Sequence, residues 1–196
     1  MMAGWLKTGG TGEYHTLAQP PDEVRSQLGR LGVDIDSPAS NELPPLIVDW
    51  YTHTTGLASK ETGFPSTLKV AEFSIGLIDF MKGPPVPDRL IIADDESTFT
   101  RFNDERSWVE LMLARVIPGG RMRKITAILG IMSGVHSEWA YRRLEGACDG
   151  VIDFKLDELD RSTRSVMRIR NMRNAAFDSQ WHPLTIGENF EVTLEK

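Results

Sequence analysis

Hydrophobic residues along this chain fall into two patterns, short apolar runs typical of buried strands and longer stretches with helical spacing. The apolar runs predict strands at 13–18, 43–50, 89–94 and 124–132. The helical spacing predicts helices at 22–31, at 66–81, from Asn103 or Asp104 to a point before Pro118, and at 137–147. Residues 52–65 are polar and predict a loop.

The order of these segments predicts the fold class. Strands that alternate with helices are typical of a mostly parallel sheet with helices on both faces. Three further strands, expected near 150–157, 164–172 and 184–194, follow one another without a helix and predict a C-terminal antiparallel extension. The helix at 66–81 is apolar nearly all round, so we expect it to be packed on all sides.

Composition narrows the class of protein. A length of 196 residues, with 40% hydrophobic and 26% charged residues, predicts one globular α/β domain over residues 1–196. The net charge of −6 argues against a general nucleic-acid binder. Cys148 is the single cysteine, no run approaches the roughly 18 apolar residues of a membrane span, and the N-terminus carries no signal-peptide pattern. We therefore expect a cytoplasmic protein without membrane association.

Four segments carry a resemblance to a known family. Residues 12–32 resemble the strand and helix that follow the family's nucleotide loop, and residues 88–97 (Asp-Arg-Leu-Ile-Ile-Ala-Asp-Asp-Glu-Ser) resemble its Walker B strand. Residues 149–153 and 168–186 resemble its C-terminal hairpin. On these segments the chain resembles the RecA-type ATPases of the KaiC-like kind, including the archaeal RadA paralogues. The resemblance implies a RecA-like fold and assembly into oligomers.

Two departures from that family concern ATP. The 196 residues contain no Gly-x-x-x-x-Gly-Lys-Ser/Thr, the loop whose backbone and lysine hold phosphates. The paired glutamates that activate water in the family match Ala18 and Gln19 here, and neither side chain can accept a proton from water. The resemblance therefore implies a degenerate, N-terminally shortened member, without the phosphate loop and the central strand before it. We expect no ATPase activity and no cofactor, with ATP and magnesium as the less favoured alternative.

Asp94 and Asp95 end the strand that resembles Walker B. A carboxylate there would lie at the carboxyl ends of the strands, where ligands of open α/β sheets bind. Without a phosphate loop, we interpret both as a relic of Walker B, with Asp94 a hydrogen-bond anchor rather than a catalytic group. The alternative is that they begin a solvated loop.

Three arginines late in the chain are candidate binding residues. Arg173 follows Asn171 where the family often has Lys-x-Arg, so it could act in trans on the nucleotide of a neighbouring subunit; the alternative is a surface ion pair. Arg168 and Arg170 share a strand face and could contact phosphate or nucleic acid, although such residues are more often solvated and balanced by acids. The four histidines and Cys148 show no metal-ligand spacing, so we expect no metal.

Three functions remain open from the sequence. The first is a non-catalytic regulatory or assembly subunit that forms homo-oligomers or pairs with a related ATPase. The second is a DNA-associated recombination accessory, for which the late arginines are the support. The third is a residual ATPase that holds nucleotide through another loop such as 52–65.

Overall fold

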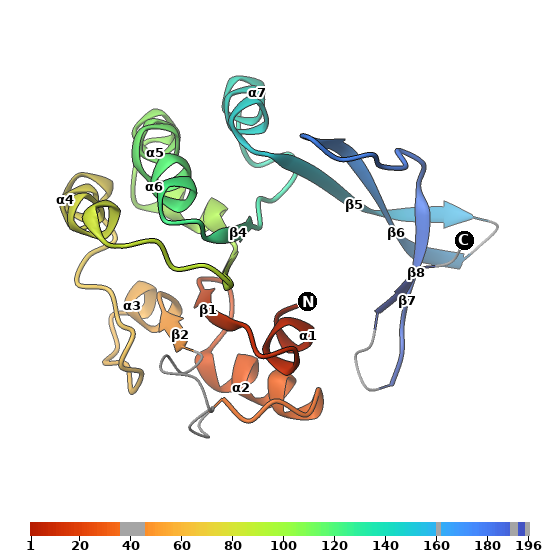
Figure 1. The fold of residues 1–196 in the computed structure, drawn as a ribbon, viewed down its shortest axis with the longest axis horizontal. Coiled ribbons are helices and arrows are strands. Elements are labelled where there is room, and N and C mark those ends of the chain that lie inside the picture. The colour runs from red at the N-terminus through yellow and green to blue at the C-terminus, as the bar shows by residue number, and fades with distance from the viewer. Residues whose placement is uncertain (36–45, 160–161, 189–191, 195–196) are drawn as a thin grey trace. The chain divides into compact units, whose positions relative to one another are not determined.

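The computed structural model describes residues 1–35, 46–159, 162–188 and 192–194 (Figure 1). The chain divides into two compact units, Met1–Leu144 and Glu145–Lys196. The expectation of one domain over residues 1–196 stays a prediction. In the described part of the chain, no helix combines the length and apolar character needed to cross a membrane.

The first unit contains a four-stranded parallel sheet, as predicted. Its strands are β1 (Thr11–Thr16), β2 (Leu46–Asp49), β3 (Arg89–Asp94) and β4 (Thr126–Leu129), in the order β2-β1-β3-β4. All three pairings are parallel, and Thr16 is in register with both Asp49 and Asp94. The carboxyl ends of the strands therefore meet along one edge. The predicted strand at 43–50 is confirmed from residue 46; residues 43–45 lie outside the described part of the chain.

Helices cover both faces of this sheet, which confirms the predicted layering (Figure 1). On one face, α1 (Met2–Lys7) and α2 (Pro21–Arg30) bury Met2, Val24 and Leu28 against strand residues such as Ile47 and Leu90. On the other face lie α4 (Val70–Lys82), α5 (Glu105–Leu111) and α7 (Glu138–Ala147). The core of this second face is built on Trp108 and Val109, whose side chains are fully buried.

The helix predicted at 66–81 is shorter and more exposed than expected. It begins at Val70, the one buried residue along α4. Phe73 and Leu77 pack against the core, whereas Ile75 is 68% exposed and Ile78 is also exposed. The expectation of packing on all sides is therefore wrong. The helix α4 carries apolar side chains on all its faces, but only one stripe of them packs against the core.

Two other boundaries differ from the prediction. The helix that begins after Asp104 does not end before Pro118, because α5 passes through a π-helical turn (Met112–Val116) into α6 (Ile117–Met122). Pro118 lies in the first turn of α6, where no backbone N–H is required. The predicted polar loop at 52–65 also begins with a helical turn, α3 (Tyr51–Thr55), which ends at Gly56 with φ of 72°.

The second unit is a four-stranded antiparallel sheet in the order β5-β6-β7-β8, which confirms the predicted antiparallel strands. Its strands are β5 (Gly150–Leu159), β6 (Ser162–Met172), β7 (His182–Ile186) and β8 (Val192–Leu194). The strand expected at 184–194 is thus two strands. β5 is an outer strand, and a bulge interrupts its pairing with β6 between Val151 and Ile152.

Candidate functional site

Asp94 lies at the carboxyl edge of the parallel sheet, at the end of β3. Its backbone oxygen accepts hydrogen bonds from the N–H groups of Leu17 and Ala18, at 2.8 and 3.2 Å. Its carboxylate accepts a hydrogen bond from the hydroxyl of Tyr14, 3.0 Å from Oδ2. Both backbone and side chain of Asp94 thus join β3 to β1 at the point where β1 ends.

A chain of hydrogen bonds extends from Asp94 to α2. The side-chain amide of Gln19 donates to the Tyr14 hydroxyl at 3.4 Å, and the amide of Gln27 donates to Gln19 at 3.1 Å. Burial, and then the negative charge of Asp94, raise the pKa of Tyr14. Tyr14 therefore stays protonated and acts as a donor to Asp94. Gln19, at a position of the family's paired glutamates, contributes an amide to this chain rather than an acid.

A cavity of about 350 Å³ lies beside Asp94 on the α1–α2 face of the sheet. Among the residues that the structure describes, its polar side chains are Tyr14, Gln27 and Asp94, and no lysine or arginine lines it. The other lining residues are Met1, Met2, Ala3, Val24, Leu28, Leu31, Ile92, Ala93, Ile128 and Gly130. Gly130 has little room for a side chain, because a Cβ there would lie 3.2 Å from the Ala93 oxygen. The cavity is therefore apolar with one acidic corner.

The two acids that follow Asp94 are buried at the start of a 3₁₀ helix, η1 (Glu96–Arg101). Oδ1 of Asp95 has no hydrogen-bond partner among the described residues. Glu96 accepts a hydrogen bond from the Trp108 indole at 3.5 Å, and burial raises its pKa. Burial favours the neutral acid at Glu96, so this residue does not present a solvent-facing base.

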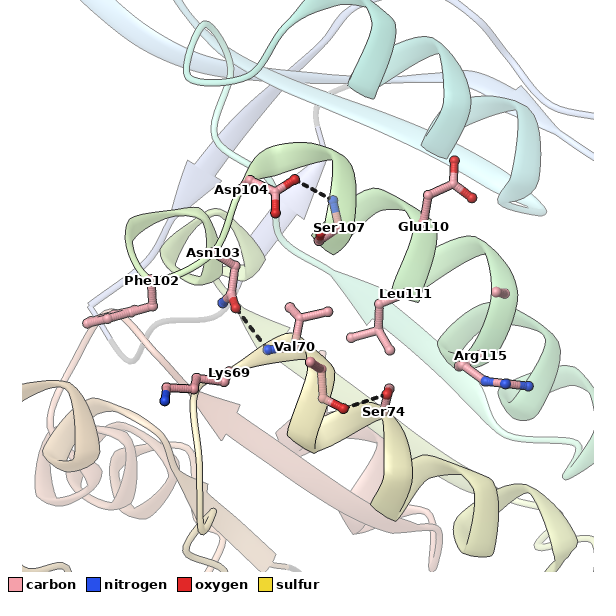
Figure 2. Close-up of a pocket in the computed structure, with 12 residues that line it drawn as sticks. Lys69, Val70, Ser74, Phe102, Asn103, Asp104, Ser107, Glu110, Leu111 and Arg115 are labelled. Atoms are coloured by element: carbon pink, nitrogen blue, oxygen red, sulfur yellow. Dashed lines mark hydrogen bonds between the residues drawn. The ribbon is translucent and has the colours of Figure 1, made fainter.

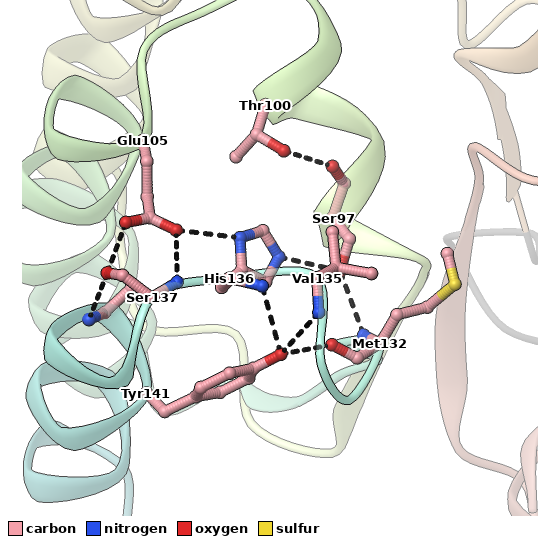
Figure 3. A network of polar contacts seen from close by, with 9 residues as sticks. Ser97, Thr100, Glu105, Met132, Val135, His136, Ser137 and Tyr141 are labelled. Carbon is pink, nitrogen blue, oxygen red and sulfur yellow. Dashed lines mark hydrogen bonds and ion pairs between the residues drawn. The ribbon is translucent and has the colours of Figure 1, made fainter.

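Behind this edge, Ser97 and Glu105 flank the buried His136 (Figure 3). Nε2 of His136 lies 2.9 Å from the Ser97 hydroxyl, and Nδ1 lies 3.3 Å from Glu105. The imidazole stacks on Trp108 with a centroid distance of 4.9 Å. The order serine, histidine, carboxylate is that of a hydrolytic triad. However, Ser97 is 3% exposed and its oxygen accepts from the N–H of Met132, so the group is closed to substrate.

A second hollow, of about 620 Å³, lies between the start of α4 and α5 (Figure 2). Asn103 lines it and holds the start of α4, accepting from the Val70 N–H and donating to the Leu68 oxygen, each at 2.8 Å. Asp104 caps α5 by accepting from the N–H of Ser107 at 2.9 Å. These polar groups stabilise helix starts, so the hollow is a structural junction rather than a reaction centre.

Arg168 and Arg170, the predicted phosphate or nucleic-acid contacts, are paired with acids within the second unit. Both guanidinium groups bind Asp153, at 2.9 and 2.7 Å, and Arg170 also binds Glu145 at 2.9 Å. Arg168 lies over the ring of Trp181 at 4.6 Å. This arrangement matches the alternative of balanced surface arginines. A role in binding phosphate stays a prediction.

Arg173, the predicted trans-acting residue, lies just beyond the end of β6. Its side chain donates to the backbone oxygen of Gly146 and lies 3.7 Å from Asp149, with 45% of the side chain exposed. The ion pair is the alternative expected from the sequence. Action on a neighbouring subunit stays a prediction.

Sequence reasoning missed Tyr14, Glu96 and Asp49 as polar residues of the sheet edge. Asp49 ends β2 as Asp94 ends β3, and it is 1% exposed. Its carboxylate accepts from the N–H of Thr52 at 2.8 Å and from the Ser59 hydroxyl at 2.5 Å. The shared position of two aspartates after apolar runs was the available signal for Asp49. Only the register of β1 against β3 reveals Tyr14.

A family model described as "ATPase: KaiC" matches residues 1–195. The chain belongs to the KaiC family of ATPases. A KaiC-like protein of the hyperthermophilic archaeon Pyrococcus horikoshii OT3 has a similar structure, with a TM-score of 0.70 and 20% identity over 98% of this chain and 80% of that chain. An uncharacterized P. horikoshii protein, solved with an unknown peptide, has the same TM-score of 0.70 and 14% identity, over 100% and 84%. No curated protein matches the chain.

Membership of a KaiC family of ATPases raises the question of whether ATP and magnesium fit the edge at Asp94. With its described residues, the cavity there offers a triphosphate one carboxylate and no cationic side chain. Among the residues that the structure describes, no group of three acids, histidines or cysteines is placed to hold a metal ion. A polyanion is repelled by the Asp94 carboxylate, whose described partner in this cavity of low polarity is the neutral Tyr14 hydroxyl rather than a cation. The described residues therefore do not fit bound ATP.

Proposed function

We propose that this chain is a non-catalytic KaiC-family protein that acts as a regulatory or assembly subunit. It would work through self-association or by pairing with an intact ATPase paralogue. The observation that carries the proposal is the Tyr14–Asp94 hydrogen bond beside a cavity whose described lining has no lysine or arginine. Asp94, which matches the family's magnesium-associated acid, here accepts a hydrogen bond from the Tyr14 phenol. The described lining of the cavity beside it has no cationic side chain to bind phosphate.

Two further features support the proposal. Ala18 and Gln19 provide no base for water, and the Gln19 amide is engaged with Tyr14 and Gln27. Glu96, the nearest other acid on the chain after Asp95, is buried against Trp108. The P. horikoshii protein solved with an unknown peptide adds that one protein of this fold binds a peptide.

Calorimetric titration of the purified chain with ATP and magnesium tests the proposal, with the mass of the same samples measured by light scattering. We expect no saturable binding at millimolar nucleotide and a mass above that of one chain, 22.0 kDa. Saturable binding that the Asp94→Asn variant abolishes would contradict the proposal and favour the residual ATPase instead. Asp94→Asn is a suitable control because an amide oxygen can still accept the Tyr14 hydrogen bond.

A further inference from the structure

The outer edge of β5 is an unpaired strand edge in the second unit. β5 spans ten residues, Gly150–Leu159, and β6 is its one neighbour in the described sheet. Alternate backbone N–H and C=O groups on its outer side therefore have no strand partner there. A long edge of this kind is a template for pairing with another chain, and many edges are protected by bulges or charges.

The two faces of β5 differ sharply in character. Ile152, Phe154 and Leu156 are 39%, 63% and 69% exposed, and they share one face because residues two apart point the same way. Asp153 and Lys155 alternate with them on the other face. A partner strand on this edge must therefore offer apolar residues on one face and complementary charges on the other.

We propose that the partner is β5 of a second copy, paired antiparallel about a two-fold axis. Such an axis is perpendicular to the sheet, so each face of one copy continues into the same face of the other. With Phe154 on the axis, Lys155 of each copy lies opposite Asp153 of the other, a carboxylate that Arg168 and Arg170 bind within their own copy. On the apolar face, Phe154 meets Phe154 of the second copy, and Ile152 meets its Leu156. Directly opposite pairs of opposite charge and of aromatic or branched residues each stabilise a sheet.

The neighbouring registers are less favourable. An axis through Asp153 places two aspartates opposite each other, and an axis through Lys155 places two lysines opposite each other. An axis through Leu156 brings Glu158 onto the apolar face opposite Phe154. The sequence of β5 is thus complementary to itself in the register centred on Phe154. Ile186, Val192 and Leu194, the other exposed apolar residues of this sheet, lie on β7 and β8 and take no part in the pairing.

This inference rests on the proposed function, because it assumes that the chain self-associates. It adds the surface through which two copies would pair, the outer edge of β5. Sedimentation velocity of the wild-type chain over a range of concentrations is expected to show a species of twice 22.0 kDa. Phe154→Lys places two like charges on the axis and should leave only the monomer. Ile75→Lys on α4 is the matched control, since Ile75 is 68% exposed in the other unit, and it should dimerise like the wild type.

Cross-linking gives a second readout that does not depend on weakening the dimer. In a Cys148→Ser background, Phe154→Cys should form a disulfide-linked dimer on oxidation, because opposite Cβ atoms of paired strands lie about 4.5–5.5 Å apart. Ile75→Cys in the same background should not. A wild-type chain that stays monomeric at every concentration, or a Phe154→Lys dimer as stable as the wild type, would overturn the proposal. Nucleotide binding in the calorimeter would instead contradict the proposed function and leave the β5 dimer standing.

Discussion

The hydroxyl of Tyr14 and the carboxylate of Asp94 join the two central strands of the parallel sheet through a hydrogen bond of 3.0 Å. Tyr14 is in register with Ile92, so its phenol reaches along β3 to the residue that ends the strand. Because burial and the charge of Asp94 raise the pKa of Tyr14, the phenol remains a donor throughout the neutral range. Asp94 is thereby held as part of the sheet edge.

Removal of this hydroxyl should weaken the sheet edge. We expect Tyr14→Phe to lower the free energy of unfolding by about 1.5–3 kcal/mol, the usual range for a hydrogen bond to a charged group. Urea denaturation followed by circular dichroism measures the change. Tyr51→Phe is the matched control, because the Tyr51 hydroxyl makes no hydrogen bond among the described residues, and it should cost much less. Equal effects of the two substitutions would show that the Tyr14–Asp94 bond adds nothing to stability.

Glu13 should make the unit sensitive to acid. Burial alone would raise the pKa of Glu13, but its hydrogen bond to His15 at 3.1 Å, the charge of His15 and the guanidinium of Arg89 outweigh this and lower the pKa to about 2. A depressed pKa contributes stability above the ordinary value of 4.5, and this stability is lost as pH falls toward 2. Linkage puts the full contribution at roughly 3 kcal/mol.

Denaturation at a series of pH values tests this prediction. Wild-type stability should fall between pH 4.5 and about 2 more steeply than that of Glu13→Gln, which has no proton to gain. At neutral pH, Glu13→Gln should be the less stable protein, since the Arg89 charge loses its partner. Glu110→Gln is the control, because Glu110 is 52% exposed in its pair with Arg143. This variant should lose stability between pH 4.5 and about 2 as steeply as the wild type. Parallel curves for wild type and Glu13→Gln would contradict the assignment.

The alternation of strands and helices was sufficient to predict the layers and the parallel sheet. β3 begins and ends at the expected residues because the run from Leu90 to Ala93 is apolar and is followed by acids. The course of α5 into α6 was not predictable in the same way. Pro118 usually ends a helix, and only a π-helical turn before it moves the proline into the first turn of a new helix.

The candidate site was predictable in part. Asp94 was found because a carboxylate after a buried strand marks the sheet edge. Tyr14, however, lies within β1 and reads in the sequence as an ordinary strand residue, and its bond to Asp94 depends on the register of strands 80 residues apart. The partners of Arg168 and Arg170 likewise follow from the pairing of Asp153 with β6, which sequence alone does not provide.

Glu96 should destabilise the protein as pH rises. Its pKa is raised by burial, so the native state favours the neutral acid and loses stability as pH increases through the ordinary carboxyl range and above. Glu96→Gln keeps an acceptor for the Trp108 indole without the charge. We expect this variant to be more stable than the wild type at pH 7, on the order of 1–2 kcal/mol, as when other buried charges are replaced. The gain should disappear at acidic pH. A loss of stability at neutral pH would show that Glu96 is used as an anion.

Substitution of Ser97 distinguishes a structural role of the Ser97–His136–Glu105 group from a hydrolytic role. Ser97→Ala leaves Nε2 of the buried His136 without this partner and removes the acceptor of the Met132 N–H, which should cost about 1–3 kcal/mol of unfolding free energy. Ser74→Ala is the control, because that hydroxyl bonds only the Ala71 oxygen of its own helix and the substitution should be nearly neutral.

Chromogenic esters provide the second measurement. The wild type should hydrolyse them no faster than Ser97→Ala, because a serine that is 3% exposed cannot meet an acyl carbon. Hydrolysis that depends on Ser97 would mean that this side of the sheet opens in solution, and the group would then have to be treated as catalytic.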